Sequence, residues 1–216
     1  MPENSKPFVE HKILFKTIIG SHMWGMNHIN SDVDYFVCFA YDTRLILRNP
    51  RALQESFFVH TAREDTHYHE IGKVVEQLLK GNLNYILGVM SPKTVITTEH
   101  HKKLKELLER YPPRNAYHSI RGFAVHSYMN ALKEESPPTE HRLNKILRVL
   151  EFGITLLKTG TYEFRAVSGA TPDLIKTKLK ELDEAYRKST LNERIPEDAI
   201  RDLLLEIRLE NLKDAK

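Results

Sequence analysis

The 216-residue sequence has a single cysteine, Cys38, so no disulfide can form within the chain. It has no apolar run near the roughly 18 residues that a membrane helix requires. Its first ten residues are polar, without the apolar core of a signal peptide. These absences predict a protein of a reducing cytoplasm with no membrane partner. A Walker loop and a His-Glu-x-x-His motif are also missing, which argues against P-loop chemistry and zinc hydrolysis.

The apolar pattern predicts an α/β first half and an all-helical second half. Short β-branched and aromatic runs predict strands at residues 13–19, 33–41, 57–61 and 65–68. Helical spacing predicts helices at 71–79, 82–92, 99–109, 117–133, 139–158, 172–188 and 196–211. Pro112-Pro113 breaks this pattern. We therefore expect an N-terminal domain at 1–112 and a helical C-terminal domain at 113–216.

Two aspartates mark the start of the second predicted strand. Asp32 and Asp34 are two residues apart, so along a strand they face the same way, with Cα atoms about 6–7 Å apart. Paired carboxylates at this spacing repel each other unless a cation lies between them, and oxygen ligands favour Mg²⁺ or Mn²⁺. Two such ions can support in-line displacement at phosphorus. We expect Asp65, near the end of a following strand, to supply the third carboxylate, with Glu64 and Glu70 as alternatives.

Other residues are suited to binding a triphosphate. Gly20-Ser21 follows the first predicted strand, where a glycine turn and a hydroxyl can approach phosphate oxygens. His141, Lys145 and Arg148 recur on one face of a predicted helix, either as a solvated face or as a cationic wall over the phosphates. His67 and His69 are candidates to line the same cleft, whereas Cys38 is expected in the core.

These residues carry a family resemblance. Gly20-Ser21, Gly25 and Ser31-Asp32-Val33-Asp34 resemble the signature of the DNA polymerase beta nucleotidyltransferase superfamily. Within it, the chain is similar to the RNA-ligase-associated predicted nucleotidyltransferases. Further similar stretches are 65–70, 79–84, Ser91-Pro92, 147–150 and 156–160. The resemblance implies a small mixed sheet backed by helices.

The resemblance also implies site residues and an activity. Asp32, Asp34 and Asp65 would bind Mg²⁺ or Mn²⁺ and act in catalysis, while Gly20, Ser21 and Ser31 would bind the nucleotide. Lys145 and Arg148 complete the predicted nucleotide site. The expected reaction moves a nucleoside monophosphate from a nucleoside triphosphate to a hydroxyl acceptor and releases pyrophosphate. An RNA end is the preferred acceptor, a small molecule or a protein side chain being the others.

Phe36 departs from the family pattern. It stands where we expect arginine, on the face of the strand that carries the aspartates. This departure keeps two alternatives open, namely a catalytically inactive nucleotide- or RNA-binding module and an antitoxin-like protein that binds a partner. The sequence indicates no oligomeric state.

Overall fold

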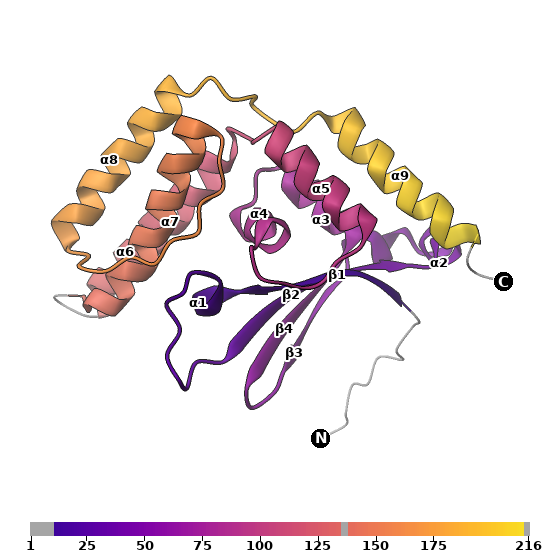
Figure 1. The fold of residues 1–216 in the computed structure, drawn as a ribbon, viewed down its shortest axis with the longest axis horizontal. Coiled ribbons are helices and arrows are strands. Elements are labelled where there is room, and N and C mark those ends of the chain that lie inside the picture. Colours follow the sequence, from indigo (N-terminus) through magenta and orange to yellow (C-terminus); the bar gives the residue numbers. More distant parts are fainter. Residues whose placement is uncertain (1–10, 135–137, 214–216) are drawn as a thin grey trace.

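A computed structural model describes residues 11–134 and 138–213 and shows a mixed α/β fold (Figure 1). Its five-stranded sheet has the order β3-β4-β2-β1-β5. The strands are β1 (His11–Ile19), β2 (Val33–Tyr41), β3 (Ser56–His60), β4 (Glu64–Glu70) and β5 (Thr94–Ile96). Strands β2 and β4 run parallel and the other neighbours antiparallel. The predicted α/β class with a small mixed sheet is confirmed.

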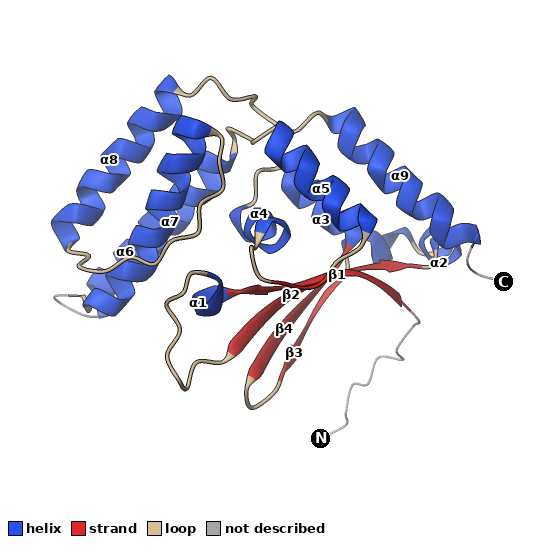
Figure 2. Cartoon of the chain, in the orientation of Figure 1, coloured by secondary structure: helices blue, strands red, loops and turns tan. Residues whose placement is uncertain are grey.

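Helices cover one face of the sheet and extend beyond one end of it (Figure 2). The helical elements of the first half are α1 (Gly20–Met23), α2 (Thr43–Arg48), the 3₁₀ helix η1 (Pro50–Gln54), α3 (Ile71–Leu79), α4 (Leu83–Met90) and α5 (Glu99–Arg110). Those of the second half are α6 (Ala116–Glu134), α7 (Glu140–Thr159), α8 (Pro172–Lys188) and α9 (Glu197–Lys213). No described helix has the length and apolar character needed to span a bilayer.

Most predicted elements are found within a few residues of their expected bounds. Helix α2 and strand β5 lie where no element is predicted. Asp42 caps α2 by accepting a hydrogen bond from the Arg44 backbone N–H. This start signal is easy to miss because the helix has only six residues. Strand β5 has three exposed residues and pairs only with β1 in the sheet.

The register of the parallel pair places the predicted site residues on one face. Asp34 on β2 lies opposite Asp65 on β4, and Phe36 lies opposite His67. Side chains alternate along a strand, so these four share one face. Phe36 on this face is buried against Gly88 of α4, which identifies it as the face that the helices cover.

Helix α9, near the end of the chain, packs against elements of the first half. It contacts α2, α3, α5 and β2 and runs beside α5 in Figure 1. Its Arg208 forms a 2.7 Å ion pair with Glu70, whose side chain is fully buried. Buried apolar side chains from both halves form one continuous cluster. The division of the chain at Pro112 stays a prediction, and α9 packs against the half that precedes it.

Candidate functional site

A pocket of about 400 Å³ lies where the sheet, α1 and α4 meet the α6–α7 pair. Its sheet wall carries Asp34 and the rings of Phe36, His67 and His69. The other lining residues are Ile19, Gly20, Met23, Trp24, Leu83, Asn84, Tyr85, Leu87, Phe123, Arg148 and Val149. Gly20, Asp34 and Arg148, predicted from distant parts of the sequence, therefore border one cavity.

Gly20 makes room for the Asp34 carboxylate. Its φ of 64° lies in the left-handed region that favours glycine. A Cβ atom built on Gly20 would lie 1.8 Å from Asp34 Oδ2, far inside any real contact distance. The glycine at the β1–α1 junction is thus required twice, for its backbone conformation and for the position of the acidic group beside it.

The three predicted carboxylates differ in their surroundings. Burial raises the pKa of Asp34, and the negative charges of Asp65 and then Asp32 raise it further, while His67 and His22 lower it. Asp65 is half-buried and its carboxylate accepts a hydrogen bond from His60 Nδ1. Asp32 is exposed in the loop before β2. Both other carboxylates therefore act electrostatically on Asp34.

All ligand atoms of these three carboxylates are oxygens, and their like charges repel one another. Both features favour the binding of a hard divalent cation. The three carboxylates do not form a compact group in this structure. Within the described residues, ligand atoms of three acidic or histidine side chains lie within 4.8 Å of one another only at His100, Glu206 and Glu210. That Asp32, Asp34 and Asp65 converge around a bound cation stays a prediction.

The two reserve carboxylates point away from the pocket by strand alternation. Glu64 is exposed and opposite Val33 in the register. Glu70 is fully buried, pairs with Arg208 and accepts a 2.6 Å hydrogen bond from the Gly72 N–H. Asp65 is therefore the β4 carboxylate that shares the face of Asp34.

Arg148 faces the pocket from α7. Burial lowers the pKa of its guanidinium, and the charge of Asp34 opposes that shift. Its Nε atom is buried with no hydrogen-bond partner. The guanidinium lies 5.5 Å from the ring centroid of Trp24, whose own ring packs edge-on to Phe152. Arg148 is the only lysine or arginine among the described lining residues, and its unused Nε donor suits an anionic ligand.

Ser21, Ser31 and Lys145 do not line this pocket. Ser21 lies in α1, and its carbonyl accepts a hydrogen bond from the Met26 N–H. The Ser31 hydroxyl accepts a 2.8 Å hydrogen bond from the His28 N–H, so it stabilises the loop before β2. Lys145 is exposed on α7, where its charge lowers the pKa of His141.

Aromatic rings form the floor of the pocket. The buried Phe36 ring lies 4.6 Å from that of His69 and 5.7 Å from that of Tyr85. Burial lowers the pKa of His69 to about 4, with further lowering by Lys73 and His67, so its ring is neutral at pH 7. The sequence correctly placed His67 and His69 in the cleft and Cys38 in the core. It missed Tyr85 and Phe123, which reach the pocket from helices whose spacing indicates only packing.

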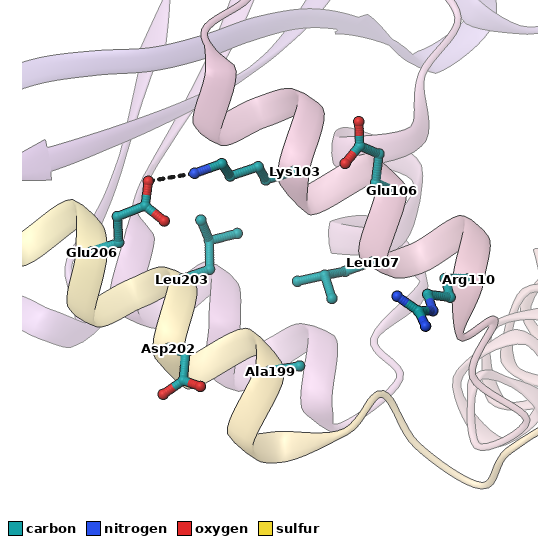
Figure 3. A pocket seen from close by; sticks show the side chains of 8 residues that line it. All are labelled: Lys103, Glu106, Leu107, Arg110, Ala199, Asp202, Leu203 and Glu206. Carbon is teal, nitrogen blue, oxygen red and sulfur yellow. Dashed lines mark hydrogen bonds and ion pairs between the residues drawn. The ribbon is translucent and has the colours of Figure 1, made fainter.

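A separate groove of about 370 Å³ lies between α5 and α9 (Figure 3). Lys103 and Glu206 form a 2.5 Å ion pair there. The same Glu206, with Glu210, approaches the Nε2 atom of the buried His100 at 3.8 and 3.2 Å. The two carboxylates thus already have positively charged or hydrogen-bonding neighbours, as expected of a contact that holds α9 against α5.

A family model agrees with the resemblance seen in the sequence. The model of the RNA repair pathway DNA polymerase beta family matches residues 3–215. An uncharacterized protein of Methanocaldococcus jannaschii, MJ0002, is 27% identical over 189 residues, which are 81% of this chain and 77% of that protein. A solved nucleotidyltransferase-like protein from Exiguobacterium sibiricum is 14% identical, with a TM-score of 0.34, over 94% of this chain and 69% of that one.

Proposed function

Because the chain belongs to the RNA repair pathway DNA polymerase beta family, we propose that it is a nucleotidyltransferase acting on a nucleoside triphosphate and a hydroxyl acceptor. The acceptor oxygen forms a bond to the α-phosphorus, the bond from that phosphorus to the bridging oxygen of the β-phosphate breaks, and pyrophosphate leaves. RNA is the preferred acceptor, since the family description names RNA repair and the chain has a net charge of +3.

In this proposal Asp32, Asp34 and Asp65 would hold Mg²⁺ or Mn²⁺. The bound cation would offset the charge of the phosphates and make the acceptor oxygen a better nucleophile. Asp34 lies at the pocket wall and so would be the nearest of the three to a bound nucleotide. Asp65, on the neighbouring strand, orients the acceptor hydroxyl and takes its proton.

The remaining predicted residues serve the triphosphate. Arg148 donates hydrogen bonds to phosphate oxygens from the helical side of the pocket. Gly20 and Ser21 bring the start of α1 close to the phosphates, and Ser31 fixes the loop that carries Asp32. Lys145, one turn from Arg148 on α7, would add positive charge where a longer ligand leaves the pocket.

The observation that carries the proposal is the position of Asp34. It lies opposite Asp65, abuts Gly20 and shares a 400 Å³ pocket with Arg148. The test is incubation with each labelled triphosphate, Mg²⁺ or Mn²⁺, and total RNA. We expect transfer of label by the wild type and none by Asp34→Ala. Absence of transfer to any acceptor, together with normal folding, would count against the proposal.

A second candidate, a nucleotide-binding module without catalysis, is favoured by Phe36. Its ring occupies the position where the family resemblance leads us to expect arginine, and it is buried between Phe15 and His69. The pocket consequently has fewer phosphate ligands than expected. This candidate predicts that a triphosphate binds with unchanged affinity to Asp65→Asn and is never turned over.

A further inference from the structure

A row of aromatic rings leads from the pocket to the open edge of the sheet. The ring centroids of His69 and His67 are 6.4 Å apart, with 9° between their planes. The next ring, Phe58 on β3, has its centroid 4.7 Å from that of His67 and 6.2 Å from that of His60. These four side chains share the face of Asp34 and Asp65, because the register sets Phe58 opposite His67 and His60 opposite Asp65.

The outer part of this row is open to solvent. The Phe58 residue is 52% exposed and the His60 side chain 66% exposed, on a strand that forms the edge of the sheet. A phenylalanine this exposed gains little from burial in the folded chain, so packing does not explain its place beside two histidine rings. The row passes Asp65, which His60 contacts, and ends at the pocket floor beside Phe36.

We propose that Phe58, His67 and His60 form a stacking platform for the terminal bases of a single-stranded RNA acceptor. This inference rests on the proposed nucleotidyl transfer and identifies which acceptor the site takes. Flat rings at the edge of a sheet bind unpaired bases through their π-faces and do not select a sequence. A strand lying on this platform would carry its terminal hydroxyl past Asp65 toward Asp34 and the bound triphosphate.

Charges along the platform fit a phosphate backbone. Arg63 is exposed in the turn between β3 and β4. Lys73, at the start of α3, is close enough to His69 to lower its pKa. These two cations flank the row at opposite ends of β4, as expected for a groove that follows a polyanion.

The test measures binding of a fluorescein-labelled adenylate octamer by anisotropy at low salt. Phe58→Ala removes the ring, and Phe58→Leu keeps apolar volume without a π-face. Loss of one stacking contact should weaken binding about 5- to 100-fold in both variants. Phe58→Tyr should bind within about twofold of the wild type. The matched control is Val59→Ala, because Val59 is the next residue of β3, is 41% exposed and faces the other side of the sheet.

The outcomes separate the platform from the proposed function. Unchanged affinity in Phe58→Ala, equal losses in Phe58→Ala and Val59→Ala, or no octamer binding by the wild type would overturn the platform. If the last result occurs while label transfer to another acceptor continues, nucleotidyl transfer stands and the acceptor is a small molecule or a protein. Octamer binding that depends on Phe58, without any transfer of label, would support the platform and contradict the proposed nucleotidyl transfer. Urea midpoints near that of the wild type show that the variants fold.

Discussion

Replacing Gly20 with alanine tests the arrangement of the candidate site most directly. The added Cβ would lie 1.8 Å from Asp34 Oδ2, whereas real Cβ contacts essentially never fall below 3.0 Å. The carboxylate must therefore retreat by about 1.2 Å or change rotamer. Misplacing a catalytic group by about 1 Å can cost on the order of 100-fold in rate. We expect Gly20→Ala to lose at least that much of the proposed transferase activity.

The same substitution also strains the backbone, and Gly25 provides the control for this effect. Gly20 and Gly25 have φ values of 64° and 68°, so alanine at either position costs about 1–2 kcal/mol. In a chain of this size that corresponds to a melting temperature lower by about 2–8 °C. A Cβ on Gly25 meets nothing within 4 Å. Gly20→Ala should be destabilised at least as much as Gly25→Ala, because it also carries the clash with Asp34, and only Gly20→Ala should lose activity.

The assay pairs thermal unfolding, followed by circular dichroism, with initial rates of label transfer under saturating triphosphate. A Gly20→Ala protein that keeps more than about a tenth of the wild-type rate would refute the view that Asp34 needs the space beside this glycine. Equal inactivation of Gly25→Ala would show that backbone strain, and not the clash with Asp34, explains the loss.

Three further predictions concern Arg208, His69 and Arg148. Arg208→Ala should lower the free energy of unfolding by about 3–5 kcal/mol in urea, because it strands the buried Glu70 carboxylate; Arg201→Ala, which removes exposed ion pairs of the same helix, should cost under about 1 kcal/mol. The pKa of His69 is lowered to about 4, so as pH falls the imidazole takes up a proton in the unfolded chain before it does so in the folded one. The free energy of unfolding should therefore drop by about 1–2 kcal/mol from pH 6.5 to 4. His69→Gln should flatten that slope. Arg148→Ala should raise the KM for the triphosphate about 10- to 100-fold in initial-rate assays, and a KM unchanged within twofold would remove Arg148 from the phosphate site.

The strands that carry the aspartates could be predicted because two signals in their residues, β-propensity and alternation, both indicate a strand. Strand β2 begins at Val33 and ends at Tyr41, as the sequence predicts. The sequence alone could not fix the pairing of Asp34 with Asp65, because strand register depends on contacts between segments that are distant in the chain. The ion pair of Glu70 was harder still to predict. An acidic residue before a helix indicates an N-cap, which Glu70 is, and its partner Arg208 lies far away on the last helix.

The pocket shows a similar limit. Gly20, Asp34 and Arg148 were predicted from chemistry and meet in one cavity, whereas Tyr85 and Phe123 reach it from helices that read as packing elements. Phe58 gave no signal beyond strand propensity in the sequence. Its importance appears only when exposure and the neighbouring rings are known, since one aromatic residue in a strand is ordinary.

The bond between Glu70 and Arg208 has a consequence for the order in which the protein forms during synthesis. Glu70 emerges with the sheet, but its buried carboxylate must wait for a cation carried by the last helix. Until then the acid either keeps its proton or stays in water, so β4 and α3 cannot settle into their final packing. A nascent chain therefore completes the packing of its first half only when α9 docks, and a protein truncated before that helix would leave Glu70 without its cation.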